Sequence, residues 1–139
     1  MSRDFLLPLR VYIEDTDAGG IVYYVNYLKY LERARTEYMR SLGFGREFIF
    51  NAALMFVVRD VSLRYLEPAR LDEELTATAA VTGLGGAWIE FHQSVRRGDA
   101  VLVEGDIRIV CVRQGSVKPA RLPAELVGAL QPLLEEPSD

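Results

Sequence analysis

The stretch from Tyr24 to Leu42 constrains the fold most, because its hydrophobic residues follow a helical period. Apolar side chains recur every three or four residues and so share one helical face: Tyr27, Leu31, Ala34, Tyr38 and Leu42. Charged residues occupy the other face: Lys29, Glu32, Arg33, Arg35 and Glu37. The sequence predicts a long amphipathic helix that starts between Tyr24 and Asn26 and is capped at its end by Gly43.

The rest of the chain follows the pattern of β-strands. Apolar and polar side chains alternate over residues 5–13, 60–65 and 75–82, and residues 87–96 and 101–113 are rich in Val, Ile and aromatics. Arg97-Gly98-Asp99 predicts a hairpin turn, and Gly83, Gly85 and Gly86 mark the turn before it. One strand, one long helix and four strands predict an α+β domain with the helix packed on an antiparallel sheet. A short helix is expected after Pro123, with a frayed tail from Glu135.

Size and composition narrow the class of protein. A length of 139 residues suits a single domain over residues 1–139. Half of the residues are hydrophobic and the net charge is -4, which is typical of a soluble globular protein without overall attraction for nucleic acid or an anionic membrane. The apolar stretches are shorter than the hydrophobic region of a signal peptide or a membrane-spanning helix, so neither export nor membrane insertion is expected. The single Cys111 cannot form an intrachain disulfide, so a cytoplasmic location is expected.

Reactive side chains are densest in the loop before the predicted helix. Glu14, Asp15 and Asp17 are followed by Gly19-Gly20, which allow a sharp turn. From spacing alone, an Asx turn whose carboxylates only cap the helix remains as good an interpretation as a catalytic one. A metal site is disfavoured, because Gly19 stands where a third oxygen ligand is needed and no bidentate Glu follows at the required distance.

The start of the predicted helix offers this loop a set of hydrogen-bond donors. Its free backbone N–H groups and the positive end of its dipole would point back at the carboxylates. A carboxylate beside such donors can act as base or nucleophile, while the donors stabilise charge on a carbonyl oxygen. This pairing suits acyl transfer from a thioester, because a thiol of pKa about 8.5 leaves without strong acid assistance.

Other nucleophile systems lack their residues. The single histidine, His92, lies within a predicted strand beside Trp88 and Phe91, and the chain has neither a G-x-S-x-G motif nor a catalytic cysteine motif. The run Gly83-Leu84-Gly85-Gly86 lacks the Lys and helix of a phosphate loop. Cys111 alternates within a strand and is expected in the core.

The acidic loop and the helix resemble the hotdog-fold acyl-CoA thioesterases of the 4-hydroxybenzoyl-CoA thioesterase type. The resemblance is carried by Asp15-Thr16-Asp17-Ala18-Gly19-Gly20-Ile21-Val22-Tyr23-Tyr24, Asn26-Tyr27 and Glu32-Arg33-Ala34-Arg35-Thr36-Glu37. The chain is most similar to the subgroup encoded with the bacterial Tol–Pal envelope system. Two later segments agree with that subgroup, Tyr65-Leu66-Glu67-Pro68-Ala69-Arg70-Leu71-Asp72 and Lys118-Pro119-Ala120-Arg121-Leu122-Pro123.

The resemblance implies a five-stranded antiparallel sheet wrapped around one long helix, assembled into homodimers or homotetramers with active sites at the dimer interface. It implies that Asp17 is the catalytic carboxylate, acting as nucleophile or general base. The oxyanion donor would be the backbone N–H of Tyr24, which places the helix start before Asn26. The implied substrate is an acyl-CoA, whose coenzyme A is part of the substrate, with no metal or other cofactor.

Two features leave a second interpretation open. Many members of the Tol–Pal subgroup carry His where this chain has Tyr24, so only a backbone role carries over. The CoA phosphates would need Arg or Lys, and the sequence does not rank the candidates: Arg59, Arg64, Arg96, Arg97, Arg113, Lys118 and Arg121. The alternative is a hotdog protein that binds an acyl-CoA, an acyl carrier protein or an envelope partner with little catalysis.

Overall fold

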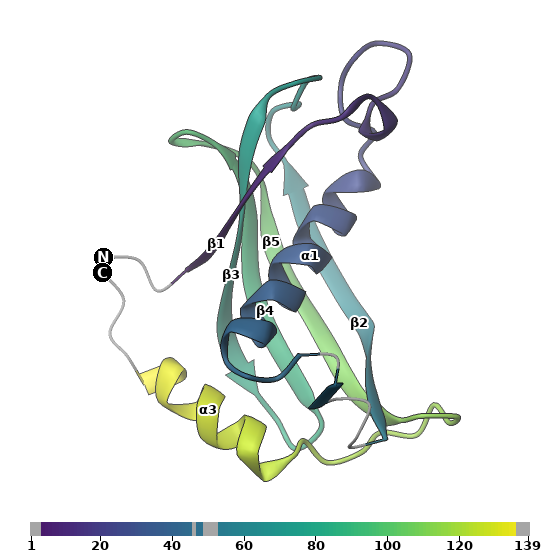
Figure 1. Ribbon diagram of the computed structural model, residues 1–139, viewed down its shortest axis with the longest axis vertical. Helices are drawn as coiled ribbons and strands as arrows, with labels where there is room; N and C mark the ends of the chain where they lie inside the picture. Colours follow the sequence, from purple (N-terminus) through teal and green to yellow (C-terminus); the bar gives the residue numbers. More distant parts are fainter. Residues whose placement is uncertain (1–3, 46, 49–52, 136–139) are drawn as a thin grey trace.

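A single antiparallel sheet curves around one long helix in the computed structural model, which describes residues 4–45, 47–48 and 53–135 (Figure 1). The helix is α1, Asn26–Ser41. The strands lie in the order β1 (Phe5–Arg10), β3 (Glu74–Leu84), β4 (Trp88–Arg97), β5 (Ala100–Arg113) and β2 (Leu54–Tyr65). All neighbouring pairs are antiparallel. This confirms the α+β prediction and the five-stranded sheet around a helix that the hotdog fold requires.

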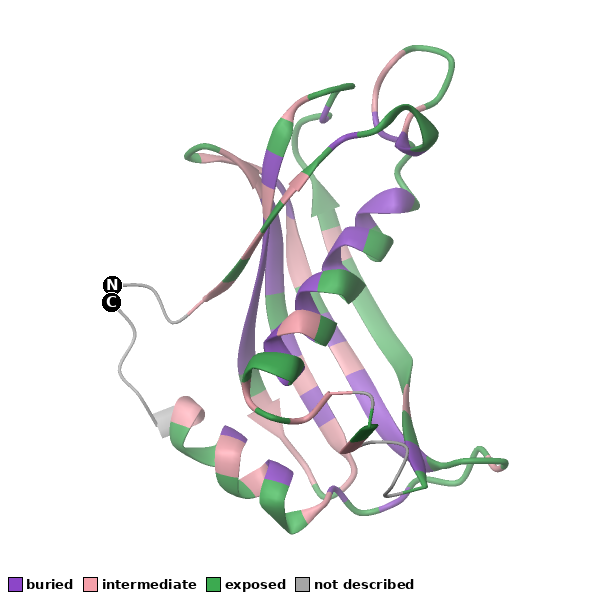
Figure 2. Cartoon of the chain, in the orientation of Figure 1, coloured by how far each residue is buried: buried purple, intermediate pink, exposed green. Residues whose placement is uncertain are grey.

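One face of α1 packs onto the sheet, as its hydrophobic period predicted. The buried residues of the predicted face are Tyr27, Leu31, Ala34 and Tyr38. Gly43 ends the helix at φ 93°, a conformation that costs glycine little, and the Phe44 N–H then bonds to the carbonyl of Met39 at 2.9 Å. The side chains of α1 and of the inner sheet face together form the core (Figure 2).

The first strand is shorter than the alternation over residues 5–13 predicted. β1 ends at Arg10, and Ile13–Asp15 form a 3-10 helix. The Asp15 N–H bonds to the Tyr12 carbonyl, while the Asp15 carboxylate accepts the Tyr12 N–H, both at 2.9 Å. These local bonds replace strand pairing, and Ile13 is therefore exposed instead of buried.

The edge strand β2 is longer than the predicted strand at residues 60–65. It begins at Leu54, and among the described residues it pairs with β5 alone, with a register shift between Val58 and Asp60. That irregularity breaks the alternation of side chains and hides the first half of the strand from a period-based prediction. Its exposed apolar side chains are Met55, Val57, Val58, Val61 and Tyr65.

The remaining turns and the second helix agree with the sequence. Gly98 makes the predicted hairpin between β4 and β5 at φ 60°. Helix α3, Ala124–Glu135, packs against β3 and buries Leu126 and Leu130. Within the described residues, no helix is both long and apolar enough to cross a membrane. The rest of the expected tail, residues 136–139, lies outside the described residues.

Candidate active site

Asp15 fastens the acidic loop to the start of α1. Its backbone carbonyl accepts hydrogen bonds from the Tyr23 N–H at 3.0 Å and from Asn26 Nδ2 at 2.8 Å. Its carboxylate is buried and already accepts the Tyr12 N–H. The side chain of Asn26, a possible helix cap by its residue type, thus holds the loop and does not cap α1. Asp15 is therefore an anchor, which leaves Asp17 as the accessible aspartate.

Asp17 stands exposed at the tip of this loop. Its Oδ1 accepts a hydrogen bond from the Gly19 N–H at 2.8 Å, so the Asx turn considered from the sequence is present. Gly20, at φ 77°, completes the turn by donating its N–H to the Asp17 carbonyl at 3.1 Å. Asp17 does not cap α1, and in the described parts of the chain its Oδ2 has no hydrogen-bond donor. One carboxylate oxygen is therefore held and the other is open.

The backbone before α1 leaves donors unpaired close to this loop. α1 begins at Asn26, so the start before Asn26 that the family resemblance implied is wrong. The residues just before α1 form a tight turn instead, in which the Asn26 N–H bonds to the Tyr23 carbonyl at 2.8 Å. Val25 already has helical angles, φ -65° and ψ -28°. Among the described residues, no backbone acceptor faces the N–H groups of Tyr24 and Val25. The predicted donor, the Tyr24 N–H, is thus open although it lies outside the helix.

Aromatic rings surround this end of α1. The Tyr24 ring lies 4.9 Å from that of Tyr23 and meets Tyr65 edge-on at 6.2 Å, measured between centroids. The rings of Tyr65 and Tyr27 are 5.7 Å apart, and the Tyr27 hydroxyl accepts the Ala69 N–H at 3.0 Å. Burial raises the pKa of both Tyr27 and Tyr65. These hydroxyls therefore add no negative charge near the open N–H groups.

Tyr30 lies behind the anchor. Its ring is fully buried, and its hydroxyl approaches the Asp15 carboxylate without making a hydrogen bond of normal geometry to any described residue. Burial raises the pKa of Tyr30, and the neighbouring Asp15 raises it further. Tyr30 therefore keeps its proton, and its buried hydroxyl lies next to Asp15.

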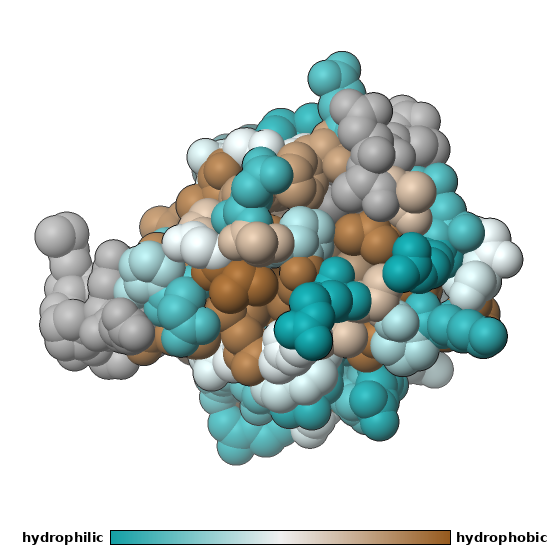
Figure 3. Space-filling view, turned by 90° about the horizontal axis from the view of Figure 1, so that it is seen from below, coloured by the Kyte–Doolittle hydropathy of each residue, from teal (hydrophilic) through white to brown (hydrophobic). Residues whose placement is uncertain are grey.

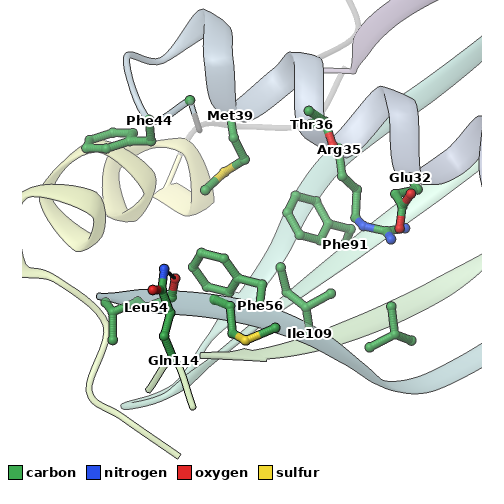
Figure 4. A pocket seen from close by; sticks show the side chains of 13 residues that line it. Glu32, Arg35, Thr36, Met39, Phe44, Leu54, Phe56, Phe91, Ile109 and Gln114 are labelled. Carbon is green, nitrogen blue, oxygen red and sulfur yellow. Dashed lines mark hydrogen bonds between the residues drawn. The ribbon is translucent and has the colours of Figure 1, made fainter. Parts of the chain in front are cut away.

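A pocket of about 480 Å³ opens between the second half of α1 and β2 (Figure 4). Its apolar lining includes Met39, Phe44, Leu54, Phe56, Phe91 and Ile109. Glu32, Arg35 and Thr36 of α1 and Gln114 add polar groups. Figure 3 looks from below at the lower end of the molecule, where hydrophobic side chains lie exposed among hydrophilic ones. The sequence did not predict this pocket, because residues far apart in the chain form it.

Arg35 is the polar residue that sequence reasoning misplaced. It was expected on the charged outer face of the helix, but it is only 8% exposed, and its Nη1 donates to Oε1 of Gln93 at 2.9 Å. Gln93 in turn donates to the carbonyls of Leu31 and Thr78, both at 3.0 Å. Burial lowers the pKa of Arg35. A weak signal was available, since Arg35 follows Leu31 by four residues at the border of the apolar face.

Ion pairs separate the seven basic candidates for the CoA phosphates into two groups. Four already pair with carboxylates: Arg59 with Asp60, Arg64 with Glu104, Arg96 with Asp4, and Arg97 with Glu67 and Glu73. Within the described ranges no carboxylate pairs with Arg113, Lys118 or Arg121, which lie at the end of β5 and just after it. Of the seven candidates, these three therefore have no carboxylate partner among the described residues that would compete with an anionic ligand.

The histidine and the cysteine, for which the sequence predicted no catalytic role, lie in strands β4 and β5. His92 is on β4 at 3.0 Å from Asp106 on β5, between Nδ1 and Oδ1. Cys111 is fully buried in β5, as predicted. The described residues contain no group of three or more His, Cys, Asp or Glu side chains that could hold a metal ion.

Known proteins are similar to this chain in sequence and in fold. The family model of the thioesterase-like superfamily matches residues 11–130. The acyl-CoA thioesterase YbgC of Haemophilus influenzae is 39% identical over 134 residues, which cover 96% of this chain and 98% of that protein. The acyl-CoA thioester hydrolase YbgC of Escherichia coli is 39% identical over 88% of this chain and 92% of its own. The crystal structure of a probable thioesterase from Bartonella henselae superposes with a TM-score of 0.82 at 33% identity, covering 86% of this chain and 99% of that one. Together these matches show that the chain belongs to the thioesterase-like superfamily.

Proposed function

We propose that this protein is an acyl-CoA thioesterase, which hydrolyses an acyl-CoA to the free acid and coenzyme A. The observation that carries the proposal is the open Oδ2 of Asp17, on a loop fastened beside the unpaired N–H of Tyr24. The relatives from Haemophilus influenzae and Escherichia coli carry the names acyl-CoA thioesterase and acyl-CoA thioester hydrolase. Coenzyme A is part of the substrate, and the proposed chemistry needs no metal or other cofactor.

In this reaction Asp17 acts at the thioester carbonyl while the Tyr24 N–H binds the carbonyl oxygen. As a nucleophile, Asp17 would displace the CoA thiolate to form an acyl-enzyme anhydride, which water then hydrolyses. As a general base, it would take a proton from a water that attacks the carbonyl directly. Both routes give the same acid and thiol, and both use the exposed Oδ2. The role of Tyr24 is confined to its backbone, since its hydroxyl is not needed in either route.

The assembly is proposed to be a homodimer or homotetramer with active sites at the dimer interface. Support comes from exposed apolar side chains on β2 and just before α1. Val57, Val61 and Tyr65 are examples on β2, and Tyr24 is the example before α1. A second copy would cover these side chains and so bury apolar surface. We place the protein in the cytoplasm, where the single, buried Cys111 would stay reduced.

The Asp17→Asn variant tests the mechanism. The amide oxygen of Asn can still accept the Gly19 N–H, so the loop is expected to keep its turn. Thiol release from a panel of short, long and aromatic acyl-CoAs should fall about 10²- to 10⁴-fold. Glu14→Gln, which changes an exposed acid of the same loop, is the matched control and should behave like wild type. Wild-type turnover by Asp17→Asn refutes the assignment.

The same panel separates hydrolysis from the alternative of a binding protein with little catalysis. If the wild-type protein releases no thiol from any acyl-CoA but retains one in native mass spectra, the binding function replaces the enzymatic one. An acyl carrier protein loaded with the same acyl groups distinguishes the two carriers. Faster thiol release from the loaded carrier protein than from the acyl-CoA would assign the substrate to the carrier protein.

A further inference from the structure

A row of side chains along α1 connects the candidate active site with the pocket. Leu28, Glu32, Arg35 and Met39 are spaced three or four residues apart and therefore lie on one side of the helix. Tyr24 precedes Leu28 by four residues, in the turn before α1. Glu32, Arg35 and Met39 line the pocket, and the side chain of Leu28, between them and Tyr24, is 37% exposed. An apolar group that starts at the Tyr24 N–H can thus follow α1 into the pocket.

β2 contributes residues at both ends of this path. At one end, Tyr65 contacts the ring of Tyr24. At the other end, Phe56 and Val58 line the pocket. From Asn26, the first residue of α1, to Glu32, at the near end of the pocket, a helical rise of about 1.5 Å per residue gives roughly 9 Å. Tyr24 lies two residues before Asn26. This distance suits an acyl group whose far end enters the pocket while its carbonyl stays at Tyr24.

Arg35 brings N–H donors that have no acceptor among the described residues into an otherwise mostly apolar pocket. Gln93 accepts one hydrogen bond from it, and no carboxylate of the described residues lies within ion-pair distance. Figure 4 shows its guanidinium pointing from α1 towards the sheet beside Glu32. Among the described residues only the Tyr30 hydroxyl is both buried and unpartnered, so the remaining N–H groups of Arg35 are open to the pocket that it lines. An oxygen on the ligand could therefore accept a hydrogen bond from them. Burial lowers the pKa of Arg35, and the negative charge of Glu32 partly offsets that effect. The same charge would repel an anionic ligand.

We infer that the pocket holds the acyl group of the substrate and that Arg35 selects acyl groups with an uncharged oxygen acceptor, a hydroxyl or carbonyl, at their far end. This inference rests on the proposed thioesterase function and adds a substrate class to it. Arg35 is a specificity-determining residue here and takes no part in bond breaking.

The test compares matched substrates with the full-length protein. Hexanoyl-, octanoyl-, decanoyl- and dodecanoyl-CoA are each paired with their omega-hydroxy and omega-carboxy derivatives, and kcat/KM is measured for every member. At the chain length that reaches Arg35, the hydroxy derivative should exceed the plain acyl-CoA by about ten- to a hundredfold, as expected for a hydrogen bond to a charged group. A ratio near unity at every length overturns the inference, and so does a preference for the carboxylate over the hydroxyl.

Three variants test whether Arg35 causes the preference for the omega-hydroxy substrate. Arg35→Met keeps the length of the alkyl stem and should bring the ratio close to unity, while Arg35→Lys should retain part of it. Arg40→Met, the same change at an exposed position of α1, should keep the wild-type ratio. An unchanged ratio in Arg35→Met overturns the inference. If Arg35→Met fails to fold, the wild-type ratio and Arg35→Lys still decide.

Binding separates failure of the inference from failure of the proposed function. Dissociation constants for the same acyl-CoA pairs, measured by calorimetry, should show the same preference and the same loss in Arg35→Met. Preferential binding without turnover would refute the thioesterase function and support the pocket assignment. Turnover without any preference would support the function and refute the role of Arg35.

Discussion

The side-chain amide of Asn26 donates a hydrogen bond of 2.8 Å to the backbone carbonyl of Asp15, eleven residues earlier in the chain. Asn26 is the first residue of α1, so this bond joins the helix to the loop that carries Asp17. The position of Asp17 relative to the Tyr24 N–H thus depends on a buried amide. Small displacements of a catalytic group are costly, because the reaction needs near-attack geometry.

Replacing Asn26 by Asp should loosen the loop, because the carboxylate has the same shape but cannot donate to the Asp15 carbonyl. We expect the free energy of unfolding to fall by about 1–3 kcal/mol and kcat to fall by about ten- to a hundredfold. Urea denaturation and thiol-release kinetics measure the two effects. Lys29→Ala, at an exposed position of the same helix, is the control. Full activity in Asn26→Asp would show that the bond does not position the loop.

Tyr24 can be tested for a backbone role by comparing two substitutions. Tyr24→Phe keeps the N–H and the ring contacts and should hydrolyse acyl-CoA at close to the wild-type rate. Tyr24→Pro removes the N–H and should lower kcat by about 10²- to 10³-fold, the usual effect of deleting an oxyanion donor. Circular dichroism and the melting temperature check that the turn survives. An equally large loss in Tyr24→Phe would instead assign a role to the hydroxyl.

Gly105 is expected to be required for the pairing of β5 with β2. A Cβ added there would lie 1.9 Å from the backbone oxygen of Ser62, so the two strands must move apart. Gly105→Ala should lower the free energy of unfolding by about 1–3 kcal/mol. Gly128→Ala is the contrast, because the part of the chain that the structure describes places no neighbouring heavy atom within 4 Å of its added Cβ in α3. A gain of about 0.5–1 kcal/mol is expected there. Chemical denaturation measures both, and equal effects of the two changes would contradict the structure.

Cys111 should be protected from thiol reagents in the folded protein. Its side chain is fully buried, and burial raises its pKa, which lowers the fraction of reactive thiolate at any given pH below that of a free cysteine. Labelling with a chromogenic disulfide at mildly alkaline pH should therefore be slow in buffer and rapid in guanidinium chloride. Equally fast labelling under both conditions would mean that β5 opens readily.

The sequence predicted the elements whose signals are local. The helical period of Tyr27, Leu31, Ala34 and Tyr38, with Gly43 behind it, defined α1 to within two residues at its start. The Asx turn at Asp17 was also predictable, because an Asp two residues before a Gly can accept that Gly N–H. Both features depend on interactions within a few residues.

Features that depend on distant residues were not predictable from one sequence. Arg35 lies at the border of the helical stripe, and its partner Gln93 is 58 residues away. Arg35 is buried because the side-chain amide of Gln93 accepts its hydrogen bond, and no local sequence pattern predicts that partner. In the same way, the anchoring role of Asp15 depends on Asn26, and the full length of β2 was hidden by its register shift.

The two edges of the sheet differ in a way that bears on self-association. β1 is six residues long and contains Pro8, which has no N–H to offer a further strand, whereas β2 is twelve residues long with an unpaired side. Two copies joined through β2 would leave only their proline-bearing edges outside. Strand addition would then end after one step, so such a dimer would be protected against open-ended polymerisation.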